Sequence, residues 1–205
     1  RKRINKRVMI LLIAMGALAA AGVAAMLLRR LPRDPDLYLE AAREATRQGQ
    51  RQVFMDSAGK AIESARDQER DDLPDFYHQI AELHIRWVDN KSLPQLDRVH
   101  SVRQAQSLLS TALRHDPNHL ACRRLLTDWY WKYTGPSRDF MAQADRLLEQ
   151  DPDDHETLYH RGLARCRHGE MRKETDLLEA GLADLRKAAE LAPEEVSYWT
   201  SLAAM

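Results

Sequence analysis

Three stretches of this chain repeat one pattern, and that pattern constrains the fold more than any other feature of the sequence. They are Ala105-x3-Leu109-x2-Ala112-x4-Pro117, Phe140-x3-Ala144-x2-Leu147-x4-Pro152 and Gly181-x3-Leu185-x2-Ala188-x4-Pro193. Spacings of four and three residues place small or apolar side chains on one face of a helix, and that face must be buried. The proline ends each helix, while its fixed φ suits the first turn of the next one. The pattern therefore predicts a succession of helices that each bury one face.

The same pattern resembles the second half of a tetratricopeptide repeat (TPR). Near the end of the chain, Trp199-x2-Leu202-Ala203 matches the W-x2-L-G opening of such a repeat, with alanine in the glycine position and in phase with Pro193. The resemblance covers about residues 36–205 and is better at 98–205 than before Asp75. It implies an all-α fold, a TPR-like α-solenoid of antiparallel helix pairs wound into a right-handed superhelix. The first helices of the pairs would line a concave groove that holds a peptide or a partner helix.

The segments that we expect follow from these repeats and from the apolar periodicity between them. They are a basic flank at 1–7, a transmembrane helix at 8–28, a neck at 29–36, a degenerate first helix pair at 37–75, a TPR-like repeat with an inserted loop at 76–119, a TPR-like repeat at 120–154, a TPR-like repeat with an insertion at 155–195, and the truncated first helix of a further repeat at 196–205. We expect a loop at 67–75, and we expect the insertion, of about seven residues, after Gly169. Between these loops, Phe76, Ile80, Leu83 and Trp87 share one side of a helix.

Residues 8–28 contain only Val, Met, Ile, Leu, Ala and Gly. As a helix they would span roughly 32 Å, about the thickness of the hydrocarbon core of a bilayer. A cleaved signal peptide is the alternative, because the alanines at 19–21 resemble a cleavage site. Signal peptides have shorter apolar regions of about 7–15 residues, which favours an uncleaved single-pass anchor. Five Lys and Arg before the helix, against three just after it, predict a cytoplasmic N-terminus with the repeats on the far side, in the periplasm if the protein is bacterial.

Small residues form a ridge on this predicted anchor, at Gly16, Ala20 and Ala24. Such ridges allow two membrane helices to approach closely. We therefore expect neighbouring transmembrane helices as partners, with contact to membrane lipid alone as the alternative.

The resemblance also implies which residues face the groove. The candidates are Arg124, Asp128 and Trp131 in one repeat and Glu156, Tyr159, Leu163 and Arg167 in the next. The alternative is that these residues are solvated or serve only packing. TPR members that hold a C-terminal carboxylate use paired Lys and Asn in the groove. This chain has Arg124 with Asp128, then Tyr159 with Leu163, so the resemblance does not extend to that mode of binding.

The sequence lacks the motifs of common catalytic sites. It contains no G-x-x-x-x-G-K-[ST], G-x-G-x-x-G, G-x-S-x-G or H-E-x-x-H. We therefore predict no enzyme activity, no cofactor, no metal site and no small-molecule substrate, and we expect the eight histidines on the surface. Cys122 and Cys166 fall too far apart in the repeat alignment for a disulfide and are predicted to be free, buried thiols. Five basic residues between 161 and 173 are predicted to pair with acidic neighbours.

Charge distribution limits the class of partner. Residues 1–33 hold eight Lys and Arg and no acid, so the remainder has 23 basic against 31 acidic residues, a net charge of −8. An acidic domain of this kind repels a phosphate backbone, and we expect no nucleic acid. The prediction is a membrane-anchored, non-catalytic scaffold, a subunit or assembly factor of a larger membrane protein complex that binds other protein subunits through its repeats. The alternative is a membrane-tethered periplasmic chaperone whose groove binds clients transiently, and an enzymatic function would require a catalytic domain outside residues 1–205.

Overall fold

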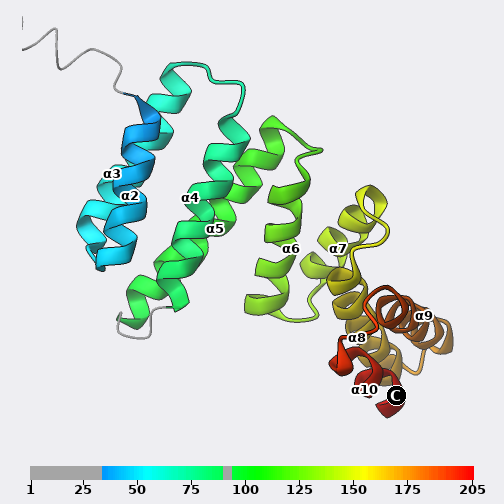
Figure 1. The fold of residues 1–205 in the computed structure, drawn as a ribbon. Coiled ribbons are helices and arrows are strands. Elements are labelled where there is room, and N and C mark those ends of the chain that lie inside the picture. Colours follow the sequence, from blue (N-terminus) through cyan, green and yellow to red (C-terminus); the bar gives the residue numbers. More distant parts are fainter. Residues whose placement is uncertain (1–33, 90–93) are drawn as a thin grey trace, which may run out of the picture.

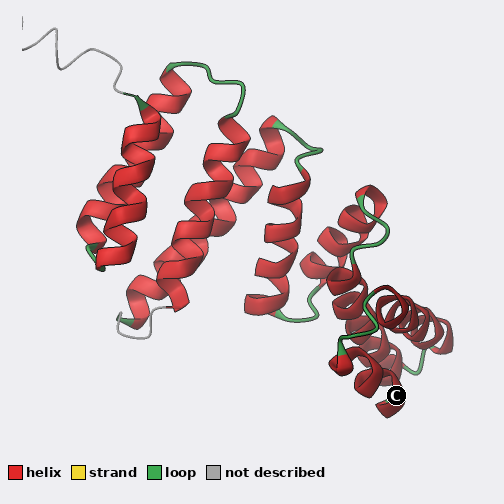
Figure 2. Cartoon of the chain, viewed as in Figure 1, coloured by secondary structure: helices red, strands yellow, loops and turns green. Residues whose placement is uncertain are grey.

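The computed structural model describes residues 34–89 and 94–205. Within these ranges the regular secondary structure is entirely α-helical, without strands (Figure 2). The helices are α2 (Pro35–Gln48), α3 (Arg51–Asp67), α4 (Leu73–Asp89), α5 (Gln95–His115), α6 (Leu120–Thr134), α7 (Arg138–Gln150), α8 (His155–Arg172), α9 (Thr175–Leu191) and α10 (Val196–Ala204). The predicted anchor at 8–28, its flank at 1–7 and residues 90–93 of the expected inserted loop lie outside the described residues.

The helices are arranged as consecutive pairs. Helix α2 packs on α3, α4 on α5, α6 on α7 and α8 on α9, and α10 then packs on α9. Figure 1 shows the pairs following one another in chain order, from α2 at one end to α10 at the other, with the last pairs turned relative to the first. This arrangement is the stack of helical hairpins that the repeats predict.

Helix ends are set by local signals. Gly49 ends α2 in the left-handed conformation, with a φ of 69°, which glycine adopts without the strain that a Cβ would bring. Each of α5, α7 and α9 ends two residues before the proline of its repeat. Asp154 caps the start of α8 by accepting a hydrogen bond from the backbone N–H of Thr157 at 2.9 Å. These signals act within a few residues, so they are visible in the sequence.

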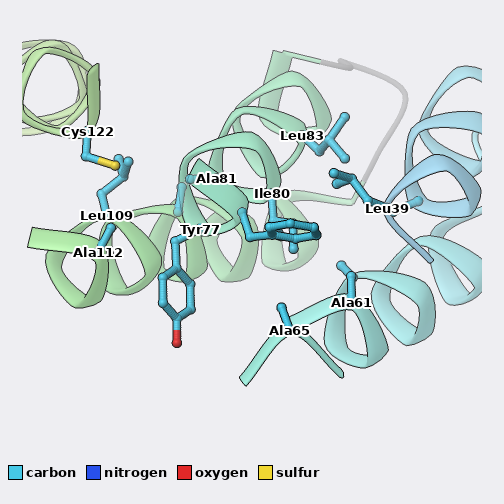
Figure 3. Close-up of a cluster of buried hydrophobic side chains, with 14 of the residues drawn as sticks. Leu39, Ala61, Ala65, Tyr77, Ile80, Ala81, Leu83, Leu109, Ala112 and Cys122 are labelled. Atoms are coloured by element: carbon cyan, nitrogen blue, oxygen red, sulfur yellow. The ribbon is translucent and has the colours of Figure 1, made fainter. Parts of the chain in front are cut away.

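The repeated apolar positions form the core between the helices. The residues of the three repeated stretches that precede the prolines are all buried: Ala105, Leu109, Ala112, Phe140, Ala144, Leu147, Gly181, Leu185 and Ala188. The predicted stripe of α4 is buried as well. Figure 3 shows Ile80 and Leu83 pointing toward Leu39 of α2, while Leu109 and Ala112 of α5 approach Cys122 of α6. Among the described residues, one cluster of buried apolar side chains runs from α2 to α6, and two smaller clusters lie between α7 and α8 and from α7 to α10. Each pair thus packs on the next one, as a solenoid requires.

Two expected loops are shorter than predicted. The loop expected at 67–75 is confined to residues 68–72, because Leu73 and Pro74 form the first turn of α4 and are buried. The insertion expected after Gly169 lengthens the helices: α8 and α9 have 18 and 17 residues, against 15 and 13 in α6 and α7. Only residues 173–174 connect α8 to α9.

Glycines explain why α8 and α9 can lie together over this greater length. A Cβ on Gly181 would be 2.8 Å from the backbone oxygen of Gly162, and a Cβ on Gly162 would be 2.9 Å from the oxygen of Gly181. A Cβ on Gly169 would be 2.8 Å from the backbone nitrogen of Leu178. Three glycines thus allow the two backbones to approach more closely than any other residue type would permit.

Candidate functional site

The first helices of the pairs form the inner row of the stack. Helix α2 contacts α4, α4 contacts α6, and α6 contacts α8, whereas the second helices of successive pairs make no comparable contacts in the described part of the chain. The row whose helices lie closer together is the inner row of a curved solenoid. The first helices therefore line the concave face, where the groove candidates were expected.

Arg124 of α6 links its own repeat to the next one. Its guanidinium donates hydrogen bonds to Asp154 at 2.6 Å and to Asp151 at 2.7 Å. Burial disfavours the Asp154 carboxylate, but hydrogen bonds from Thr157 and Arg124 outweigh that effect and lower the pKa of Asp154. The charge of Arg124 is thus compensated inside the protein.

Asp128 lies one helical turn beyond Arg124 on the same helix. The Asp128 side chain is half-buried and has no hydrogen-bond or ion-pair partner among the described residues. Burial raises the pKa of Asp128 to about 6, and the negative charges of Glu156 and Asp154 contribute to this increase. Glu156, at the start of α8, is exposed and also lacks an ion-pair partner within the described ranges. Uncompensated negative charge therefore lies between α6 and α8, two of the first helices.

Aromatic side chains continue this surface across α6, α8 and α10. The Trp131 ring stacks on His160, with centroids 4.5 Å apart. On α8, Tyr159 stacks on Tyr198 of α10 at 4.4 Å, and its hydroxyl lies 2.9 Å from the hydroxyl of Ser201. Trp131 and Tyr159 are both half-buried, so one face of each ring takes part in packing between repeats. Of the other candidates, Leu163 is half-buried and Arg167 is exposed.

The sequence did not identify His160 and Tyr198, and it misplaced some of the histidines. His84 is only 4% exposed and packs edge-on against Phe54, which contradicts its expected surface position. Burial lowers the pKa of both His84 and His160 to about 4, so both rings are neutral at neutral pH. The burial of His84 could have been predicted, because the residues at all of its i±3 and i±4 positions are apolar. The position of His160 could not, because its ring stacks on Trp131 of a neighbouring repeat.

A cluster of buried charges lies on the opposite side of α8. Arg161 donates two hydrogen bonds to Asp184 of α9, at 2.7 and 2.8 Å, and one to Asp145 of α7 at 2.8 Å. Arg165 also donates to Asp184 at 2.8 Å. The predicted pairing of the basic run with acidic neighbours is confirmed for these two arginines, although both are largely buried rather than solvated.

Two further predictions concern cysteines and metals. Cys122 and Cys166 are both free and buried, which confirms the predicted thiols. In the described ranges there is no group of three or more His, Cys, Asp or Glu side chains that could hold a metal ion.

The predicted anchor is not among the described residues, so Gly16, Ala20 and Ala24 have no described structure. None of the helices in ranges 34–89 and 94–205 is both long and apolar enough to cross a membrane.

No protein-family model and no curated protein matches this chain. Solved structures do resemble it. The TPR protein TTC0263 from Thermus thermophilus has a TM-score of 0.53 and 20% identity, covering 97% of this chain and 95% of its own. YrrB, a TPR protein with an unusual peptide-binding site, has a TM-score of 0.57 and 15% identity, covering 93% and 86%. MamA 41-end from Desulfovibrio magneticus RS-1 has a TM-score of 0.54 and 21% identity, covering 82% and 81%. Together with the all-helical structure, these likenesses show that the chain has a TPR-like fold.

Proposed function

We propose that this chain is a non-catalytic scaffold that binds protein partners on the concave face of α6, α8 and α10. In this proposal residues 8–28 anchor the chain in a membrane, with the N-terminus in the cytoplasm and the repeats on the far side. Gly16, Ala20 and Ala24 would then contact neighbouring transmembrane helices of the same complex. The chain would act as a subunit or assembly factor of that complex.

The observation that carries the proposal is the uncompensated charge of Asp128 beside the aromatic row. Burial without a partner disfavours the ionised form of the Asp128 carboxyl group. A cationic group that binds beside it would stabilise that form. Trp131 follows Asp128 by three residues on α6 and stacks on His160 of α8, whose ring lies 5.5 Å from that of Tyr159. In this proposal the two aromatic rings contact an apolar residue next to that cation. The partner chemistry that fits is a polypeptide segment with a Lys or Arg beside an apolar side chain. YrrB, which has the same fold, has a peptide-binding site.

Packing on the concave face favours a defined partner over transient clients. Surfaces that accept many partners are flexible and rich in Met or loops. Here the aromatic side chains are held by stacking at 4.4 and 4.5 Å between helices of different repeats. This rigidity supports the scaffold rather than the chaperone, which would have to adapt its surface to unfolded chains.

Site-specific photocrosslinking in intact cells would test the proposal. A photoreactive residue in place of Glu156, which is exposed in the first turn of α8, should give crosslinked species of discrete mass. The same residue in place of Glu190, which is exposed on α9, serves as the matched control. Adding Asp128→Asn should reduce crosslinking from position 156 about tenfold, because a charge-assisted contact is lost.

Solubilisation in mild detergent provides the independent test of complex membership. Without crosslinking, the partner identified from position 156 should co-purify and co-migrate with the chain. A chain that migrates alone and gives the same crosslinks from both positions would refute the scaffold.

A further inference from the structure

Two cavities on the outer side of the stack occupy equivalent positions in successive repeats. One, of about 480 Å³, lies between α7 and α9 over α8. The other, of about 400 Å³, lies between α5 and α7 over α6. When positions are counted from the proline of each repeat, every residue that lines the α5–α7 cavity has a counterpart in the lining of the other. The two cavities can therefore be compared residue by residue for the charges that line them.

The α7–α9 cavity contains its own counter-charges. Asp145 and Asp184 accept hydrogen bonds from Arg161 and Arg165, as described above. Lys187 reaches the backbone oxygen of Pro152 at 2.8 Å and pairs with Asp153 at 2.9 Å. The cations of the α7–α9 cavity are therefore neutralised by groups of the protein itself, and this cavity needs no external anion.

The α5–α7 cavity lacks a carboxylate at each equivalent position. Ser110 stands where the other cavity has Asp145, Arg114 where it has Glu149, and Gln143 where it has Asp184. Arg146 replaces Lys187, and Arg123 replaces Leu158. The lining thus holds three arginines and no acid.

None of these three arginines forms an ion pair with another described residue. Arg123 is the most enclosed, at 7% exposure. It donates hydrogen bonds to Gln150 at 3.0 Å and to the backbone oxygen of Pro117, both neutral acceptors. Burial lowers the pKa of Arg123 and the charge of Arg146 lowers it further, while Glu149 only partly offsets them. A buried cation of this kind is stabilised by an anion that reaches it.

Gln143 adds a second requirement. Its Oε1 atom is buried and has no hydrogen-bond partner among the described residues. A buried acceptor without a partner is stabilised when a bound ligand donates an N–H or O–H hydrogen bond to it. The cavity is thus complementary to a ligand that brings a carboxylate for the arginines and a donor for Gln143.

We propose that the cavity formed by Ser110, Arg114, Arg123, Gln143 and Arg146 is a second binding site, which takes the carboxylate side chain of an acidic polypeptide segment. Guanidinium–carboxylate pairing is the interaction that fills the equivalent cavity between α7 and α9. The backbone N–H of the bound segment supplies the donor that Gln143 lacks. This site lies on the outer side of the stack and does not depend on binding at the concave face.

Calorimetric titration of the full chain in non-ionic detergent tests this site. The probe is a tetraglutamate peptide with both ends blocked, and inorganic phosphate is titrated in parallel. Arg146→Gln should weaken peptide binding about tenfold, because one charge-assisted contact is lost. Gln143→Asp should abolish binding, since it restores the internal carboxylate that Asp184 provides in the next repeat. Lys187→Gln, in the self-neutralised cavity, is the matched control and should leave binding unchanged.

Each outcome decides the proposal. Saturable one-to-one binding with this pattern of variants supports it. No binding of the peptide, or binding that Arg146→Gln leaves unchanged, overturns it. Because Arg146 is exposed at the rim of the cavity, this variant remains informative even if Gln143→Asp fails to fold. Phosphate binding as tightly as the peptide, with the same dependence on the variants, overturns the assignment to a polypeptide segment.

Discussion

Replacing Gly181 by alanine probes the closest approach between two helices in this fold. A Cβ at this position would lie 2.6 Å from the sulfur of Cys166, 2.8 Å from its backbone nitrogen and 2.8 Å from the oxygen of Gly162. Two of these three atoms belong to the backbone and cannot rotate away. An ordinary contact begins at 3.4 Å, so α8 and α9 must separate by about 0.6 Å.

Two opposing effects determine how much Gly181→Ala changes the free energy of unfolding. Alanine is favoured over glycine in a helix by about 1 kcal/mol. Overpacking a well-packed core costs about 1–3 kcal/mol, and a clash with backbone on both sides belongs at the upper end. Gly59→Ala is the matched control, because Gly59 lies inside α3 and a Cβ there would meet nothing within 4 Å. Both variants gain the same helix propensity from alanine. The difference between their free energies of unfolding therefore gives the cost of the steric clash at position 181.

Denaturation with urea should show Gly59→Ala to be more stable than Gly181→Ala by about 2–3 kcal/mol. Melting temperatures should differ by roughly 4–12 °C. Because repeat arrays can unfold in parts, hydrogen exchange should also place the loss of protection in α8 and α9. Equal stability of the two variants would refute the argument that these glycines permit the close crossing.

Three further predictions follow from buried polar groups. Asp184→Asn removes the counter-charge of Arg161 and Arg165 and should cost about 2–3 kcal/mol in urea denaturation, discounted because both arginines retain some contact with water; a loss below about 0.5 kcal/mol, the range typical of surface substitutions, would contradict it. Because the folded pKa of His84 is about 4 and its ordinary value is 6.5, the unfolded chain binds more protons between these values, so stability should fall as pH drops through this window. A His84→Leu variant should show a shallower decline in pH-dependent denaturation, with some dependence left from His160. Burial raises the pKa of Cys122 to about 12, and maleimide labelling followed by mass spectrometry should be on the order of 100-fold slower at pH 7.5 than in the denatured chain.

Much of the fold could be predicted from the sequence because its signals are local. The periodicity of Ala105, Leu109 and Ala112 identifies a buried helix face within three turns of chain. Pro117, Pro152 and Pro193 mark helix ends within two residues. The order of pairs then follows, because short connections make neighbours in sequence neighbours in space.

The candidate site was only partly predictable. The repeat alignment predicts that Asp128 and Trp131 face the groove, and both residues lie on α6, one of the first helices. His160 and Tyr198 were not identified, because each owes its position to a ring on another repeat. The compensation of Arg124 by Asp151 and Asp154 likewise depends on the distance between α6 and the start of α8.

What the sequence alone determined is therefore the set of helices, their buried faces and the succession of hairpins. Only the tertiary structure decided that the extra residues after Gly169 lengthen α8 and α9, and that the α5–α7 cavity has arginines without carboxylates. The physical reason is the range of the interactions. Helix formation and capping act over a few residues, whereas backbone approach and charge compensation depend on side chains that chain distance separates and packing brings together.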